Sequence, residues 1–158
     1  MKNSPENLAL KQTLEQCQTH AQGLRDALDD MDPLHFDTFA TESLSKDNRR
    51  LLDQFAYRYT RLQDDMGARL IPAVLRALGE DVAAMPALDR FSRMEQLGLL
   101  SSADEWNNLR QIRNQFTHDY PDSALEHDKR LLAATHAAQQ LLSALALIIA
   151  KLQQRFGE

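Results

Sequence analysis

Apolar residues recur every three or four positions along most of the chain, which is the spacing of amphipathic α-helices. The first run starts at Ser4, a capping residue type that precedes a proline, and it continues to about residue 30. Its apolar positions are Leu8, Leu14, Ala21, Leu24 and Leu28. Pro33 then interrupts the period. The pattern predicts a long first helix followed by a connecting segment.

A second long run begins after Ser45, a residue type that caps helix N-termini, and reaches Gly79, a residue type common just past helix C-termini. Its apolar positions are Leu52, Phe55, Tyr59, Leu62, Met66, Leu70, Val74, Leu75 and Leu78. Pro72 lies inside this run, and proline cannot make the helical hydrogen bond of its position. We therefore expect one long helix that is kinked at Pro72.

Two shorter runs follow. The first covers residues 87–97 and is ended by Gly98, and the second begins at Ser101, which we expect to be its N-cap. The second of these runs places four large apolar side chains on one stripe: Trp106, Leu109, Ile112 and Phe116. The pattern predicts a short third helix and an amphipathic fourth helix.

The fourth helix is expected to end at residues 118–120, because Pro121 disfavours helical geometry in the residue before it. Asp122 or Ser123 then starts a last helix that runs to about Phe156. Long helices joined by short connections predict an all-α protein, an up-and-down bundle of four to five helices. Residues 1–158 form it as a single domain.

Charge and cysteine usage narrow the classes of function. A net charge of −5 argues against broad, non-specific attraction to nucleic acid. A local basic cleft remains compatible with it, because 13 of the 18 basic residues are arginine, which suits bidentate contact with phosphate. Cys17 is the single cysteine and forms no internal disulfide, and the N-terminus is polar. We expect a cytoplasmic protein.

One stretch, LLSALALIIA at residues 141–150, is strongly apolar. Its ten residues are about half of what a membrane-spanning helix requires. We expect this segment to be buried against other helices or against a second subunit, and we expect no membrane contact.

The segment RNQFTHDY concentrates polar side chains at the expected end of the fourth helix. Arg113 and His118 are five residues apart, so on a straight helix they point about 140° away from each other. An arginine followed five residues later by a histidine arises easily by chance in a chain of this composition. The addition of Asn114 and Tyr120 makes the pattern more specific.

RNQFTHDY resembles the signature of the HEPN superfamily, and specifically of its HepT-like branch, in which Arg and Asn are followed by His and, after one residue, by Tyr. The expected bundle, with the motif at the end of the fourth helix, is similar to the HEPN fold. The aromatic segment FAYRYTRLQDDMG of the second helix has a vaguer likeness. The resemblance implies a metal-independent endoribonuclease without a cofactor, the toxin of a toxin–antitoxin pair.

The resemblance also implies a role for each residue of the motif. Arg113 would hold the scissile phosphate, and His118 would be the general acid or base for attack by the ribose 2′-hydroxyl. Asn114 and Asp119 would support the site. Tyr120 would be the hydroxyl to which a nucleotidyltransferase antitoxin attaches AMP, and the added negative charge would repel RNA.

The partners implied are RNA, the cognate nucleotidyltransferase antitoxin and a second copy of the chain, with the site at the two-fold interface of a homodimer. Two alternatives stay open. The chain is a non-catalytic HEPN-like binding subunit of a nucleotidyltransferase, or it is a helical scaffold in which the motif is coincidental and Arg113 pairs with Asp64 or Asp65. These two adjacent acids point about 100° apart, so we expect no metal site from them.

Overall fold

The computed structural model describes residues 4–31, 45–117 and 124–157 of the chain, and within these ranges the protein is an all-α bundle without strands, as the pattern predicted. Its elements in chain order are α1 (Pro5–Met31), α2 (Lys46–Asp65), the π-helical segment η4 (Met66–Leu70), α3 (Ile71–Ala77), the 3-10 turn η5 (Val82–Ala84), α4 (Ala87–Gln96), α5 (Ala103–Thr117) and α6 (Ala124–Phe156).

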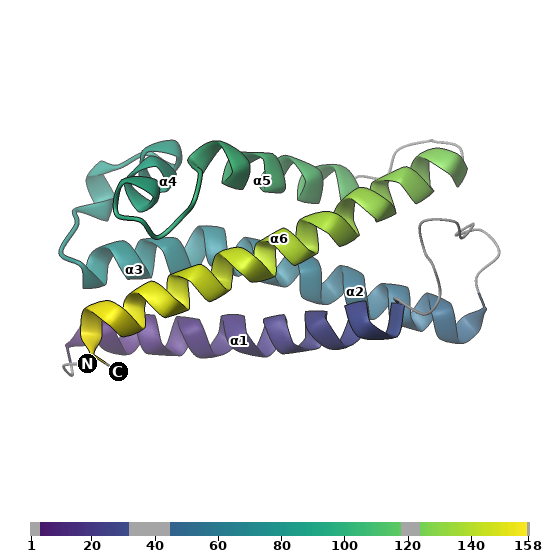
Figure 1. Cartoon of the computed structure of the whole chain (residues 1–158), viewed down its shortest axis with the longest axis horizontal. Coiled ribbons are helices and arrows are strands. Elements are labelled where there is room, and N and C mark those ends of the chain that lie inside the picture. Colours follow the sequence, from purple (N-terminus) through teal and green to yellow (C-terminus); the bar gives the residue numbers. More distant parts are fainter. Residues whose placement is uncertain (1–3, 32–44, 118–123, 158) are drawn as a thin grey trace.

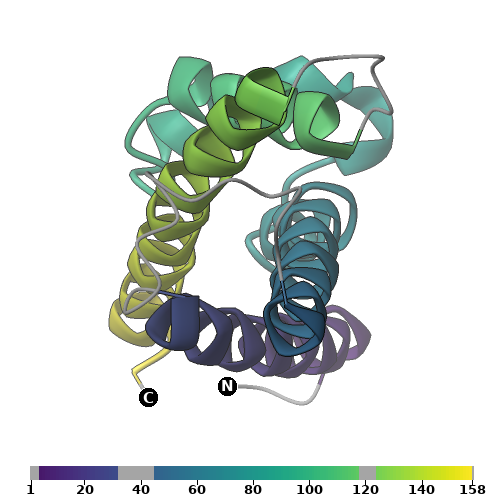
Figure 2. The same cartoon turned by 90° about the vertical axis from the view of Figure 1, so that its right-hand side faces the viewer.

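Four rods build the bundle, and α2, η4 and α3 together form one of them. Successive rods run in opposite directions along the long axis, so the start of α1 and the end of α6 lie at the same end of the molecule (Figure 1). Viewed end-on, the four rods occupy the four sides of a quadrilateral (Figure 2). Helix α1 packs along α2, and α5 packs along α6. The up-and-down arrangement therefore follows the order of the helices in the sequence.

Helix ends are fixed by the predicted residue types, with one correction. The Ser45 hydroxyl accepts a hydrogen bond from the Asn48 amide at 3.1 Å, which makes Ser45 the N-cap of α2. Gly79 and Gly98 have φ values of 84° and 76°, which suit glycine past a helix C-terminus. The prediction that Ser101 caps α5 was wrong.

Ser102 caps α5 in place of Ser101. Its hydroxyl accepts from the Glu105 amide at 3.1 Å, whereas the Ser101 hydroxyl donates to the Glu105 carboxylate at 3.3 Å. Both serines stand before the helix, and the sequence pattern does not distinguish them. The path of the chain after Gly98 brings the hydroxyl of Ser102, and not that of Ser101, to the free amide of Glu105 in the first turn of α5.

Pro72 stands just after the π-helical segment η4. The Ile71 amide donates to the carbonyl of Met66, five residues earlier, in place of the usual carbonyl four residues earlier. A wider turn at this point accommodates the proline ring and the missing amide without ending the rod. The second rod therefore continues through Pro72.

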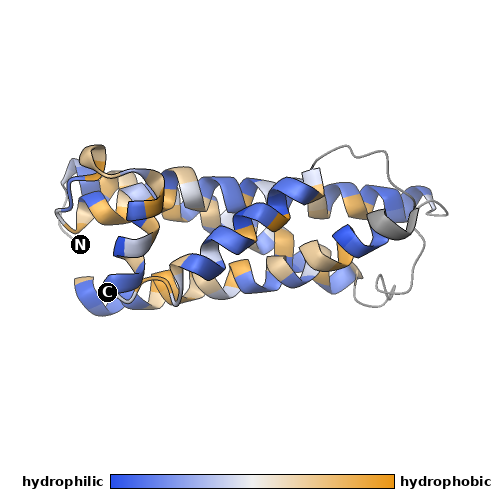
Figure 3. Ribbon diagram, turned by 90° about the horizontal axis from the view of Figure 1, so that it is seen from above, coloured by the Kyte–Doolittle hydropathy of each residue, from blue (hydrophilic) through white to orange (hydrophobic). Residues whose placement is uncertain are grey.

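The core runs along the interior of the bundle, and apolar and polar segments alternate along each rod (Figure 3). The largest fully buried side chains come from most of the helices: Leu10, Leu24, Phe55, Tyr59, Leu62, Met66, Leu70, Ile71, Leu75, Met94, Leu99 and Trp106. Cys17 is also buried in this core. Most of the apolar positions predicted from the sequence are buried or partly buried. Leu8 is the exception in α1, because it is 49% exposed whereas Leu10 is buried.

Helix α6 ends at Phe156, as predicted, and its apolar character extends beyond the ten-residue stretch. Its segment Asp128–Phe156 is long and apolar enough to cross a membrane, although the core helix of a soluble bundle has the same properties. In this structure 33% of its most apolar window is buried inside the bundle. The inward face of α6 packs on α5 and, less extensively, on α1.

We expect the core to be sensitive to side-chain truncation at Leu62, which is 0% exposed. Leu62→Ala should lower the free energy of unfolding by about 2–5 kcal/mol, because it removes buried methyl groups and leaves a cavity. Leu88→Ala is the matched control, since Leu88 is 61% exposed, and it should change stability by less than about 0.5 kcal/mol. Equal losses in urea unfolding of the two variants would contradict this packing.

Candidate functional site

Arg113 lies near the end of α5, at the edge of the core. One turn further on, Phe116 packs edge-on against Phe55 and Tyr59 of α2, with ring centroids 5.8 and 5.6 Å apart. This contact brings Arg113 beside Asp64: Nε donates to Oδ1 at 2.9 Å and Nη2 donates to Oδ2 at 2.7 Å. The result is a bidentate ion pair that joins α5 to α2.

The pairing leaves part of the Arg113 guanidinium available. Besides Asp64, Arg113 donates from Nη1 to the Thr117 hydroxyl at 2.9 Å. A guanidinium carries five N–H donors, so these three bonds leave about two for another acceptor. The side chain is 22% exposed. Asp64 and Thr117 therefore fix the orientation of Arg113 without saturating it.

A pocket of about 340 Å³ opens beside this ion pair, between the end of α2, η4, α4 and α5. It is lined by Gln63, Asp64, Gly67, Ala68, Ala87, Arg90, Phe91, Arg110, Arg113 and Asn114. The described lining thus contains three arginines and one carboxylate, in a chain whose net charge is −5. We call this cavity the arginine pocket. Its charge suits an anion, and its two motif residues are Arg113 and Asn114.

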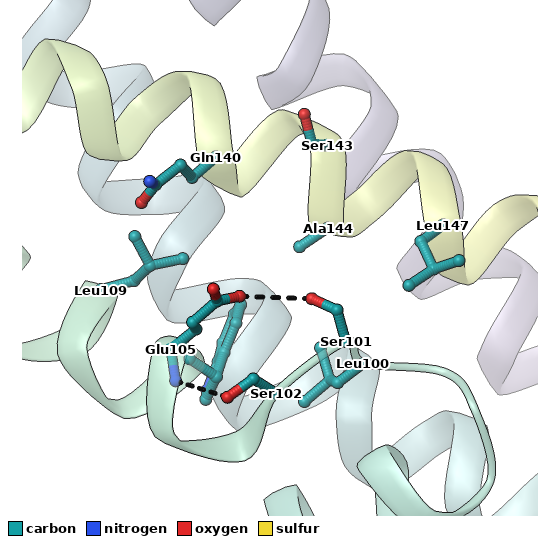
Figure 4. A pocket seen from close by; sticks show the side chains of 10 residues that line it. Leu100, Ser101, Ser102, Glu105, Leu109, Gln140, Ser143, Ala144 and Leu147 are labelled. Atoms are coloured by element: carbon teal, nitrogen blue, oxygen red, sulfur yellow. Dashed lines mark hydrogen bonds between the residues drawn. The ribbon is translucent and has the colours of Figure 1, made fainter.

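A second pocket, of about 290 Å³, lies between the start of α5 and the middle of α6 (Figure 4). It is lined by Leu100, Ser101, Ser102, Glu105, Trp106, Leu109, Gln140, Ser143, Ala144 and Leu147. Among the described residues, Glu105 is the one charged residue in its lining, which contains no arginine or lysine. A negative carboxylate disfavours a phosphate ligand here, so the arginine pocket is the candidate site.

The motif residues are only partly within the described ranges. Arg113 and Asn114 line the same pocket, whereas His118, Asp119 and Tyr120 lie outside the described residues. The described part of α5 ends at Thr117, directly before His118.

Three polar lining residues, Gln63, Arg90 and Arg110, lie outside the RNQFTHDY motif and were not predicted as site residues. Gln63 lies one residue before Asp64, and Arg90 lies on another helix, α4. No local motif marks either residue, because they meet α5 only through the packing of the bundle.

The adjacent acids Asp64 and Asp65 contact different neighbouring helices, as their 100° separation predicted. Asp64 faces Arg113 on α5, whereas Asp65 is 5% exposed and lies 3.4 Å from Nε2 of His20 on α1. Arg61 and Arg69, one turn before and one turn after Asp65, lie 3.9 and 4.0 Å from its carboxylate. The two acids therefore belong to separate charge networks and do not form one site.

The imidazole ring of His20 lies between the carboxylate of Asp65, which accepts a hydrogen bond, and the guanidinium of Arg58, which donates one. The Arg58 guanidinium donates to Nδ1 at 3.1 Å, so the ring proton is on Nε2, which faces Asp65. Burial lowers the pKa of His20 despite the opposing effect of Asp65.

Burial, assisted by Asp65, also raises the pKa of the nearby Cys17 thiol to about 12. The thiol stays protonated near neutral pH, so this cluster has no thiolate nucleophile.

Comparison of the chain with protein-family models, with curated proteins and with solved structures gives no match in any of the three. The RNQFTHDY motif and the arginine pocket are therefore the features of the chain that bear on its function. Within the described ranges, no group of three or more His, Cys, Asp and Glu side chains is placed to hold a metal ion.

We expect protonation of His20 to oppose folding. Its pKa in the folded protein is lowered from 6.5, so below about pH 6.5 the unfolded chain binds this proton more readily. The free energy of unfolding should therefore increase as the pH rises toward 6.5, and the contribution of His20 should level off above it. His20→Gln can still accept from Arg58 and donate to Asp65, and it should flatten this part of the profile. An unchanged slope in urea unfolding across this pH range contradicts the assignment.

We expect the Arg113–Asp64 pair to contribute measurable coupling. A double-mutant cycle with Arg113→Ala and Asp64→Ala should give a coupling free energy of about 1 kcal/mol, because the pair is bidentate and half-buried. The exposed pair Arg50–Asp47, 3.6 Å apart, is the control and should give a value near zero. Equal coupling in the two cycles, measured by chemical unfolding, would show that the geometry of Arg113 adds nothing.

Proposed function

We propose that this chain is a metal-independent endoribonuclease toxin of a toxin–antitoxin pair, similar to the HepT-like proteins that its motif resembles. The observation that carries the proposal is the placement of Arg113 and Asn114 in an arginine-rich pocket at the end of α5. A pocket with more guanidinium than carboxylate groups favours a phosphate ligand in an otherwise acidic protein.

In the proposed reaction, Arg113 holds the scissile phosphate through the N–H groups that Asp64 and Thr117 leave free. His118 takes the proton of the ribose 2′-hydroxyl or supplies one to the leaving 5′-oxygen. The new 2′-oxygen to phosphorus bond forms as the bond to the 5′-oxygen breaks, and no water or metal enters this step. Asn114 and Asp119 support the site, and AMP on Tyr120 silences it.

The proposal includes a cytoplasmic homodimer with the site at its two-fold axis. Arg113 and His118 are five residues apart and point in different directions on a straight helix, so two copies of the motif at one interface would complete a cleft. The partners are then RNA and a nucleotidyltransferase antitoxin.

One observation favours the alternative of a non-catalytic binding subunit. Asp64 neutralises most of the charge of Arg113, as in a purely structural ion pair. In that case the HEPN-like fold binds a nucleotidyltransferase without cleaving RNA. Catalysis by the isolated chain distinguishes the two functions.

We expect the full chain, produced without a partner and unmodified at Tyr120 by mass spectrometry, to cleave labelled RNA in EDTA and to leave 2′,3′-cyclic phosphate ends. His118→Ala should lower the rate by about 10²–10⁴-fold, the usual contribution of a general acid or base. His136→Ala is the control, because it removes an exposed histidine of α6. If the unmodified wild type does not cleave RNA, the binding subunit replaces the nuclease as the better proposal. If His136→Ala loses as much activity as His118→Ala, the role given to His118 is wrong.

A further inference from the structure

We propose that the part of the arginine pocket formed by Arg90, Arg110 and the start of α4 is a second phosphate subsite, which binds the RNA phosphate next to the scissile one. The inference rests on the proposed function, because the first phosphate is the one assigned to Arg113. It adds a ligand contact that lies outside the RNQFTHDY motif.

Arg90 is held in place by backbone carbonyls and keeps its charge uncompensated. Its Nε donates to the carbonyl of Met85 at 3.1 Å and its Nη2 donates to the carbonyl of Val82 at 3.2 Å. No carboxylate of the described residues lies within ion-pair distance of it. Carbonyl oxygens orient a guanidinium without cancelling its positive charge, so Arg90 is preorganised for an anion.

Arg110 of α5 is held by different groups, an aromatic ring and a side-chain amide. Its guanidinium lies over the ring of Phe91, 5.1 Å from the centroid, and Nη1 donates to the side chain of Asn107 at 3.3 Å. Within the described part of the chain it has no acidic partner either. An aromatic face and an amide leave the full charge of Arg110 available to a ligand.

Two further features of the pocket favour a hydrogen-bonding anion. Helix α4 starts in the pocket wall at Ala87, and Pro86 at its N-cap position supplies no capping side chain, so first-turn amides lack that acceptor. Gln63, also in the wall, is only 3% exposed, and neither its amide nitrogen nor its amide oxygen has a hydrogen-bond partner among the described residues. A buried amide without a partner is costly, and an entering ligand or water relieves that cost.

The spacing of the arginines suits consecutive phosphates of one strand. Arg110 and Arg113 stand three residues apart on α5, so they lie on neighbouring turns of one face. Arg90 enters the pocket wall from α4, and the ring of its neighbour Phe91 lies under the guanidinium of Arg110, whereas Asp64 is paired with Arg113. A single strand that follows α5 meets the partly neutralised Arg113 first and the uncompensated Arg110 and Arg90 next.

Binding is tested apart from cleavage with a short fluorescent 2′-O-methyl RNA, which lacks the attacking hydroxyl. Affinity for the full-length wild type and its variants is measured by anisotropy at several salt concentrations. Arg110→Gln should weaken binding about tenfold and reduce the slope of log affinity against log salt by about 0.7, the value for one lost single-strand phosphate contact. Arg76→Gln removes an exposed arginine outside the pocket and should match the wild type.

A second pair of variants changes the pocket without touching an arginine. Ala68 is exposed and lines the pocket, so Ala68→Glu introduces a carboxylate there, whereas Ala68→Gln adds the same volume without charge. Ala68→Glu should bind about tenfold more weakly than Ala68→Gln, because the two variants differ in charge and not in volume. This pair also covers the case in which Arg110→Gln fails to fold, as judged by thermal unfolding.

The outcomes separate the subsite from the nuclease. If Arg110→Gln and Ala68→Glu bind the 2′-O-methyl RNA as tightly as their controls, the subsite is wrong, even if the wild type cleaves ordinary RNA. Failure of the wild type to bind this RNA also overturns it. If the binding losses appear as expected but ordinary RNA stays intact, the phosphate subsite is supported and the proposed catalysis is not.

Discussion

The packing of Phe116 against Phe55 and Tyr59 is the contact on which the geometry of the site depends. It fixes the last turn of α5 on the middle of α2. Phe55 and Tyr59 are themselves stacked at 5.5 Å and fully buried, so this surface of α2 is rigid. Arg113, one turn before Phe116, meets Asp64 because this aromatic cluster sets the distance between the two helices.

Two separate charge networks start from α2, because its adjacent residues Asp64 and Asp65 point in different directions. Asp64 and Asp65 differ by one position, and the 100° between them sends one carboxylate toward α5 and the other toward α1. The first carboxylate orients a guanidinium at the edge of a pocket. The second is buried beside His20 and next to Cys17, where it contributes to the raised pKa of the thiol. The wider turn of η4 follows immediately, so both networks border the least regular part of the rod.

Net charge and local charge have opposite signs in this protein. The chain carries −5, yet the described lining of the arginine pocket contains three arginines and one carboxylate. Arg113 is mostly neutralised by its acid, whereas Arg90 and Arg110 are held by carbonyls, an amide and an aromatic ring. An overall acidic protein can attract an anion at such a place, because the field near a cavity is set by the nearest unpaired charges.

The sequence by itself determined the helices and their order. Periodic apolar residues, Ser45 at one helix start and Gly79 and Gly98 at two ends are local signals, and hydrogen bonding within a few residues is enough to realise them. It also marked Arg113 and Asn114 through their motif. Only the tertiary structure decided that Gln63 and Arg90 line the same pocket as Arg113 and Asn114. The spacing of apolar residues along the sequence does not say which side chains of different helices come into contact. Packing across the bundle interior sets those distances, and the site depends on them.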